Sequence, residues 1–311
     1  MYSNVVRSDG YIRRLLDFVR CEYGIDADDI SPAKRGFYGE TWKLCAADRR
    51  YFVKLVYAAE HKGVYENSFA VIDHMNNNGI DFISKVVKSV SENLSVQFDG
   101  AVIGVFDWID GENRQDEKSK ILEYQMMAKV YTVPTEGLNI QREDFSTKSA
   151  EKFMNHWALL PPDTPINALF ERHRARIEHR AERLRLFSER CADDTSRFFI
   201  THGDAGGNYV EGVDRNYIVD WDTPILAPPE RDAWVCMCWD WAVEGFHDAL
   251  RQNGIDYILR KERLAYYCYH MFFFYLNAYL DRFKHTSETQ GLEEYMSGWI
   301  EESFQYADKM P

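Results

Sequence analysis

A loop of residues 202–208, with the sequence HGDAGGN, constrains this chain more than any other feature. An apolar stretch leads into the loop, and its glycines allow a tight turn from which Asp204 and Asn208 project. Twelve residues after Asn208, the strand-like stretch 217–219 ends in a second carboxylate, Asp220. Each aspartate alone is also explained as a turn or strand-end cap. The two together, in this order, favour a magnesium site with hard oxygen ligands.

Lys54 lies alone in an otherwise apolar, β-rich stretch, 51–57. A lysine in such a strand either reaches solvent at a sheet edge or has a charged partner. We expect the partner to be Glu66 in the helix that follows, which would hold the ammonium toward nucleotide phosphates. Gly36 and Gly39, directly before the predicted strand 40–46, let a backbone loop fold over phosphates. A solvated edge lysine and a plain hairpin turn remain as alternatives.

The order of predicted elements indicates two parts that differ in secondary-structure content. Residues up to about Asp110 alternate β-rich stretches with amphipathic helices, and the residues after Gly111 are mainly helical, interrupted by the β-rich island 197–219. The sequence therefore predicts an α+β fold with two lobes, a mostly antiparallel sheet lobe over 1–110 and a larger helical lobe over 111–311, with a cleft between them. The expected elements are helices at 9–24, 63–78, 118–131, 148–160 and 166–191, and strands at 40–46, 51–57, 82–90 and 94–106.

Composition argues against several classes of function. The formal charge is −13, which disfavours binding to nucleic acid or to an anionic lipid surface, because their phosphates attract Lys and Arg. The six cysteines are scattered and the N-terminal residues lack a signal-peptide pattern, so we expect a cytoplasmic protein. The charge-free run 264–280 is too short to span a bilayer comfortably and contains His270 and Asn277, which favours a buried helix.

These features together resemble the aminoglycoside phosphotransferase and choline kinase family, which has a protein-kinase-like fold. The resemblance covers nearly the whole chain, and includes the strand lysine, the helix glutamate, FDWIDG at 106–111 and HGD at 202–204. Its most specific part is IVDWD at 218–222, which runs into LAPPERD at 226–232. That block is most similar to the spectinomycin phosphotransferase branch of the family.

The resemblance implies a kinase that uses ATP and Mg²⁺, with two departures from the family pattern. The family's loop has four residues between its Asp and its Asn, whereas three separate Asp204 from Asn208 here. The second metal motif reads Asp-Trp-Asp instead of Asp-Phe-Gly, so Asp222 is left open as a ligand of metal, of substrate or of neither. The implied roles are Asp204 as the catalytic aspartate, Asn208 and Asp220 as magnesium ligands, Lys54 (held by Glu66) on nucleotide phosphates, the Asp107 carbonyl and the Ile109 amide on adenine, and Asp232 as a buried structural carboxylate.

The stretch 204–248 holds ten Asp and Glu residues against two Arg. Carboxylates and aromatic rings suit amines through ion pairing and cation–π contact, so Asp222, Asp240, Trp241 and Glu244 are candidate acceptor-binding residues. We expect a cationic small-molecule acceptor, an aminoglycoside or aminocyclitol by resemblance, with a role in antibiotic resistance. We also expect a monomer or weak homodimer. A kinase of choline or another metabolite amine, and a nucleotide-binding module with reduced catalysis, remain open.

Overall fold

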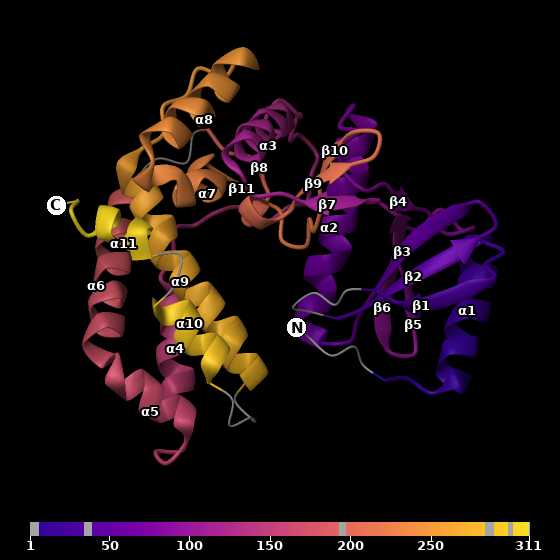
Figure 1. Cartoon of the computed structure of the whole chain (residues 1–311), viewed down its shortest axis with the longest axis horizontal. Coiled ribbons are helices and arrows are strands. Elements are labelled where there is room, and N and C mark those ends of the chain that lie inside the picture. The colour runs from indigo at the N-terminus through magenta and orange to yellow at the C-terminus, as the bar shows by residue number, and fades with distance from the viewer. Residues whose placement is uncertain (1–5, 34–38, 193–196, 284–288, 298–300, 311) are drawn as a thin grey trace. The chain divides into compact units, whose positions relative to one another are not determined.

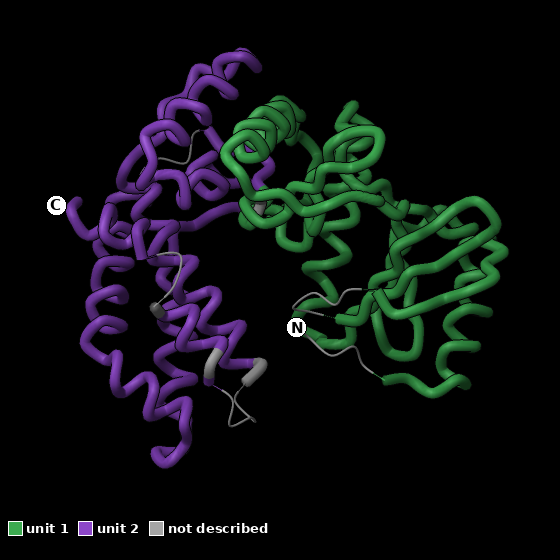
Figure 2. The backbone as a smooth tube through the Cα atoms, viewed as in Figure 1, with its two compact units in different colours: residues 1–141, 202–225 green, residues 142–201, 226–311 purple. Residues whose placement is uncertain are grey.

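The computed structural model describes residues 6–33, 39–192, 197–283, 289–297 and 301–310. Its backbone groups into two compact units, coloured separately in Figure 2. The first comprises residues 1–141 and 202–225, and the second comprises residues 142–201 and 226–311.

The first unit carries the six-stranded sheet, the three-stranded sheet and, within the described residues, the helices α1, α2 and α3 (Figure 1). In chain order its elements are α1 (Asp9–Tyr23), β1 (Asp29–Pro32), β2 (Glu40–Ala46), β3 (Arg49–Val56), α2 (Ala59–Asn77), β4 (Val86–Val87), β5 (Val96–Phe98), β6 (Ala101–Asp107), β7 (Gly111–Asn113), α3 (Glu117–Val130), the 3₁₀ turn η1 (Ala205–Gly207), β9 (Tyr209–Gly212) and β10 (Asn216–Ile218).

Helix α1 forms where the sequence predicts it. The Ser8 hydroxyl caps its first turn by accepting from the Tyr11 amide at 3.3 Å, and Gly24 ends it in the left-handed conformation, φ +64°. Tyr11, Leu15 and Val19 follow one another at intervals of one helical turn and form the buried face. This face packs into the same apolar core as the inward side chains of β2, β3 and β6.

The main sheet has the strand order β1-β2-β3-β6-β4, with β5 also paired to β6, and its strand pairs are antiparallel. Strand β6 is central, and each of its residues except Asp107 is buried. In the register of β3 with β6, Lys54 lies opposite Gly104. Lys54 therefore lies on an interior strand and not at a sheet edge, which excludes the solvated edge lysine.

Two strand predictions are wrong in extent. The stretch 94–106 is a hairpin of β5 and β6, because Asp99 (φ +48°) and Gly100 (φ +80°) form a two-residue turn with both residues left-handed. The stretch 82–90 contributes only the two residues of β4. The Ser89 hydroxyl accepts from two nearby backbone amides, those of Ser91 and Asn93, and so ends the extended conformation there.

A second, three-stranded sheet of order β10-β9-β7 follows the main sheet within the first unit. Strand β7, which comes directly after the end of β6 in the chain, pairs antiparallel with β9, and β9 pairs antiparallel with β10. This pairing joins chain segments about a hundred residues apart, so the β-rich island around residues 205–218 groups with the N-terminal sheet residues rather than with the helical unit.

The second unit is mainly helical and is built around α9 (Lys261–Phe283), which packs against α4, α6 and η2. Its aromatic side chains Tyr266, Tyr267, Phe272 and Phe273 are fully buried, which confirms the prediction of a buried helix over 264–280. The remaining elements are α4 (Lys148–Ala158), α5 (Pro165–Arg172), α6 (Arg174–Cys191), β8 (Phe199–Thr201), β11 (Ile225–Ala227, which begins at the last residue of the first unit), α7 (Glu230–Ala233), the 3₁₀ turn η2 (Trp234–Cys238), α8 (Asp240–Gln252), α10 (Gln290–Ser297) and α11 (Glu301–Ala307).

The single helix expected over 166–191 is two helices. They meet at His173, whose amide donates to the carbonyl oxygens of Leu169 (3.3 Å) and Phe170 (3.0 Å) and whose φ and ψ are −107° and 11°. Arg174, the first residue of α6, lies over the Trp157 ring at 4.6 Å. No Gly or Pro marks the break in the sequence around His173.

The mixture of an antiparallel sheet and a helical remainder confirms the predicted α+β class. The compact units divide the chain differently from the lobes expected on either side of Asp110, because residues 111–141 and 202–225 group with the sheet. Within the described part of the chain, no helix combines the length and apolar character needed to cross a membrane.

Candidate active site

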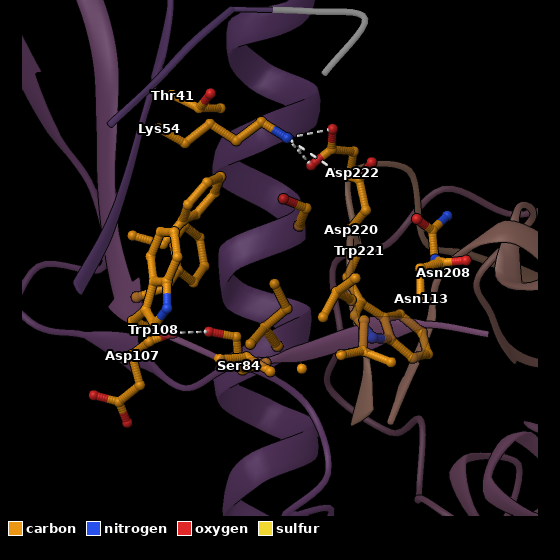
Figure 3. A pocket seen from close by; sticks show the side chains of 18 of the residues that line it. Thr41, Lys54, Ser84, Asp107, Trp108, Asn113, Asn208, Asp220, Trp221 and Asp222 are labelled. Carbon is orange, nitrogen blue, oxygen red and sulfur yellow. Dashed lines mark hydrogen bonds and ion pairs between the residues drawn. The ribbon is translucent and has the colours of Figure 1, made fainter. Parts of the chain in front are cut away.

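A cavity of about 500 Å³ lies within the first unit, beside the six-stranded sheet and α2 (Figure 3). One part of its wall is apolar and aromatic, and another part carries charged and amide side chains. The apolar lining includes Phe52, Phe69, Ile72, Phe106, Trp108 and Ile109, and the polar lining includes Lys54, Ser84, Asn113, Asn208, Asp220 and Asp222. An apolar slot next to oxygen and nitrogen ligands suits a molecule with a flat base and a charged tail.

Lys54 is the cation of this cavity that faces the acidic residues (Figure 3). Its Nζ donates to both carboxylate oxygens of Asp222, at 2.6 and 2.5 Å, and to Asp220 Oδ1 at 3.2 Å. Burial alone would lower the pKa of Lys54, which is 5% exposed, but the two carboxylates outweigh it and hold that pKa well above its usual range. The lysine is therefore charged at neutral pH.

The two carboxylates have different environments. The Lys54 ammonium lowers the pKa of Asp220, whose side chain is 46% exposed. Burial raises the pKa of Asp222 to about 6 against the opposing charge of the lysine. One ammonium thus faces two carboxylates, and the surplus of negative charge favours a cation at this end of the cavity. Asp220 also has φ +64°, a left-handed conformation that is unusual for aspartate and typical of functional loops.

The expected partner of Lys54 is wrong. Glu66 is exposed, and its carboxylate accepts a weak hydrogen bond from Gln97 at 3.5 Å. The buried face of α2 carries Tyr65 and Phe69, four residues apart, and Glu66 lies roughly 100° further around the helix. Tyr65 on α2, which the sequence reasoning missed, contacts Lys54 through its ring. The spacing of one helical turn between Tyr65 and Phe69 is the sequence pattern that could have identified Tyr65.

The loop 202–208 is anchored by its histidine. His202 is buried, its Nδ1 accepts from the Asp204 amide at 3.2 Å, and its Nε2 donates to the Val219 carbonyl at 2.8 Å. The Asn208 carbonyl accepts from the Val219 amide at 3.0 Å. These bonds bring Asn208 next to Val219, which lies between the end of β10 and Asp220, so the predicted proximity of the two motifs is present in the structure.

Hydrogen bonds within the loop 202–208 and from neighbouring elements hold this loop in its short form. The Asn208 side-chain amide donates to the Asp204 carbonyl at 2.7 Å and so closes the loop on itself. From outside, Asn113 Nδ2 donates to the Gly207 carbonyl at 2.5 Å, and Lys120 Nζ donates to the Gly206 carbonyl. The two glycines expose their carbonyls to these braces, which come from β7 and α3 and which sequence reasoning did not identify. Asp204 itself is exposed.

The predicted adenine-binding segment lines the other part of the cavity. The Asp107 carbonyl accepts from the Ser84 hydroxyl at 2.7 Å, while the Asp107 carboxylate points away from the cavity (Figure 3). The Trp108 amide donates to the Arg50 carbonyl at 3.1 Å. Ile109 lines the cavity. The roles of Asp107 and Ile109 toward adenine stay predictions, and Ser84 is an additional hydroxyl at this place.

Of the two glycines predicted to cover phosphates, Gly36 lies outside the described residues. Gly39 has φ +81°, and a Cβ at this position would lie 2.3 Å from the Leu55 carbonyl oxygen. Only glycine fits such an approach without a shift of the backbone. The close pairing of β2 with β3 therefore starts at Gly39, next to Glu40.

The remaining candidate residues lie in the second unit. Asp240 and Glu244 are exposed on α8, Trp241 is half-buried, and the Trp239 and Trp241 rings stack with centroids 6.3 Å apart. Asp240, Trp241 and Glu244 lie on one helix, and their role in acceptor binding stays a prediction. Asp232 is buried, as predicted for a structural carboxylate.

A comparison with protein-family models places the chain among phosphotransferases. Residues 29–267 match the model of the phosphotransferase enzyme family, which is more than half of the chain, so the protein belongs to that family. No curated protein matches the chain significantly in a comparison of sequences.

Solved structures confirm the protein-kinase-like fold. A spectinomycin phosphotransferase in complex with ADP and spectinomycin is 19% identical, with a TM-score of 0.70 over 96% of this chain and 94% of that chain. An amicoumacin kinase in complex with AMP-PNP, Ca²⁺ and Ami is 11% identical, with a TM-score of 0.65 over 96% of this chain and 94% of that chain. A choline kinase from Streptococcus pneumoniae is 14% identical, with a TM-score of 0.62 over 95% and 98%.

Proposed function

We propose that the protein is an ATP- and Mg²⁺-dependent kinase that transfers the γ-phosphoryl group to a hydroxyl of a cationic small molecule. The observation that carries the proposal is the contact of the buried Lys54 with Asp220 and Asp222, beside Asn208, in an aromatic-walled cavity. Phosphoryl transfer needs this set: a lysine for phosphates, oxygen ligands for a divalent cation and room for a base.

Each residue has a role in the proposal. Lys54 binds the nucleotide phosphates, and the Asp107 carbonyl and Ile109 amide pair with adenine. The donor chemistry fits Mg²⁺, because the Asn208 amide oxygen and the Asp220 carboxylate are hard ligands and the local carboxylates outnumber the ammonium. Bound Mg²⁺ would neutralise charge on the transferred phosphoryl group. Asp204 accepts the proton of the acceptor hydroxyl. The hydroxyl oxygen attacks the γ-phosphorus, and ADP leaves.

The proposal assigns the two functions to the two predicted lobes. Residues 1–110 supply the lysine, the glycine turn and the adenine-binding segment, which makes them the nucleotide-binding lobe. Residues 111–311 supply the loop 202–208 and α8, which makes them the lobe for catalysis and for the acceptor. We propose a monomer or weak homodimer as the working form.

The proposed acceptor is an aminoglycoside or aminocyclitol, with spectinomycin as the first compound to test. Two observations support this. The exposed carboxylates of Asp240 and Glu244 accompany the stacked Trp239 and Trp241 on one segment, a combination that suits amines. Among similar folds are enzymes whose ligands are spectinomycin and amicoumacin. Because a choline kinase shares the fold as well, a metabolite amine is the second candidate.

The experiment is Mg²⁺-dependent ADP formation with a panel of spectinomycin, aminoglycosides, choline and neutral polyols. Attraction between exposed charges is screened by salt, so the KM for the acceptor should rise with ionic strength. Asp240→Asn and Glu244→Gln should raise it further and leave the KM for ATP unchanged. Asp248→Asn is the matched control, because Asp248 lies on the same helix and pairs with Arg251.

The outcomes separate the alternatives. ADP formation that needs an amine and Mg²⁺ supports the kinase, and the preferred amine decides between antibiotic and metabolite. Turnover with neutral or anionic acceptors alone contradicts the acceptor class. Nucleotide binding without turnover on any compound favours the module with reduced catalysis.

A further inference from the structure

Lys54 is enclosed by a tyrosine as well as by carboxylates. Tyr65 on α2 is 2% exposed, and its hydroxyl donates to Asp222 Oδ2 at 2.7 Å. The centre of its ring lies 4.8 Å from Lys54 Nζ, within cation–π distance. The tyrosine therefore touches the ammonium through its ring and the ammonium's partner through its hydroxyl.

These contacts fix both ends of the ion pair. Asp222 uses both of its oxygens on Lys54, and a carboxylate so placed must itself be held against rotation. The Tyr65 hydroxyl supplies that restraint from the opposite element, α2. Tyr65 is thus the neighbour of Lys54 on this helix, whereas Glu66 contacts Gln97 instead.

Tyr65 holds Asp222 with an uncharged hydroxyl, which affects the net charge around Lys54. Burial raises the pKa of Tyr65, so its hydroxyl stays a hydrogen-bond donor over the whole working pH range. It adds no negative charge to a place where Asp220 and Asp222 already exceed the one lysine.

We propose that Tyr65 is the positioning residue of the phosphate-binding lysine: with Asp222 it holds Lys54 in place, the part that the sequence pattern assigned to Glu66. The proposal rests on the proposed function of Lys54, contact with nucleotide phosphates. It assigns Asp222 to the lysine and not to the acceptor.

The test compares a ligand that has phosphates with one that lacks them. ADP reaches the phosphate-binding lysine, and adenosine does not. Tyr65→Phe keeps the ring and removes one hydrogen bond to a charged group, so the affinity for ADP should fall about tenfold. The affinity for adenosine should stay within about twofold of the parent. Tyr65→Leu, which also loses the ring, should lower the affinity for ADP further.

Two comparison variants make the result decisive. Glu66→Gln should leave both affinities at the parental values, because the glutamate is exposed. Lys54→Met should lower the affinity for ADP and leave that for adenosine. If Lys54→Met does not weaken ADP, the proposed function of the lysine is wrong.

Three results would overturn the positioning role of Tyr65 and leave the proposed function of Lys54 standing. In the first, Lys54→Met weakens ADP binding but Tyr65→Phe does not, and in the second, Glu66→Gln weakens ADP binding as much as Tyr65→Phe does. In the third, Tyr65→Phe weakens adenosine binding as much as ADP binding, which is the result expected of a merely structural role.

Discussion

Gly39→Ala is the substitution whose effect follows most directly from the geometry. The new Cβ would lie 2.3 Å from the Leu55 carbonyl oxygen and 3.2 Å from its carbon, on a residue with φ +81°. Placing a side chain in the left-handed conformation costs about 1–2 kcal/mol. Relieving the contact by a backbone shift costs about 1–3 kcal/mol more, the range for an overpacked site.

The free energy of unfolding should therefore fall by about 2–5 kcal/mol. For a chain of this size the Tm should drop by roughly 3–8 °C. Because Thr41, two residues along β2, lines the cavity, the same shift should raise the KM for ATP. Urea and thermal unfolding measure the first effect, and steady-state ADP formation the second.

Gly63→Ala is the control, because Gly63 lies on α2 and a Cβ there would meet no neighbouring side chain of the described residues within 4 Å. It should stabilise the protein by up to about 1 kcal/mol, the helix-propensity difference between Gly and Ala. If Gly39→Ala unfolds at the parental midpoint and binds ATP as tightly, the close approach of Gly39 to β3 is not a constraint and the reasoning fails.

Three further perturbations test other parts of the account. Lys120→Met removes the brace on the Gly206 carbonyl and should lower kcat about ten- to a hundredfold with little change in the KM for ATP, whereas Lys118→Met, an exposed change on the same helix, should not. Asp220→Asn should raise the Mg²⁺ concentration needed for half-maximal rate at saturating ATP, and an unchanged Mg²⁺ dependence would remove Asp220 from the ligands. Burial lowers the pKa of His270, so the unfolded chain gains a proton below about pH 6.5 that the folded chain does not. Stability should then be lost as pH falls through that value, and the loss in urea midpoint should be smaller in His270→Gln.

The sequence predicts the elements with strong local signals. Helix α1 has a serine cap, a regular apolar face and a terminal glycine, and it forms within one residue of the predicted ends. Strand β2 matches its predicted range, Glu40–Ala46. The Asp99-Gly100 turn was an equally strong signal, and reading it would have divided the stretch 94–106 into two strands.

What the sequence does not predict depends on tertiary contacts. The pairing of β7 with β9 places residues near 112 and 211 together, and no local sequence pattern predicts this pairing. The same pairing brings Asn113 to the loop 202–208 as a brace. The choice between Tyr65 and Glu66 as the neighbour of Lys54 depends on which face of α2 packs on the sheet. Helical periodicity from Phe69 would have pointed to the tyrosine.

The most direct test of the central claim is phosphoryl transfer by Asp204→Asn. The substitution keeps the backbone carbonyl that accepts from Asn208, so the loop should keep its form. We expect kcat to fall by roughly 10²–10⁴-fold, the usual cost of losing a positioned acid–base group, with the affinity for ADP unchanged. Near-parental turnover by the folded variant, on the acceptor that the parent uses best, would contradict the assignment of this site as the centre of a kinase.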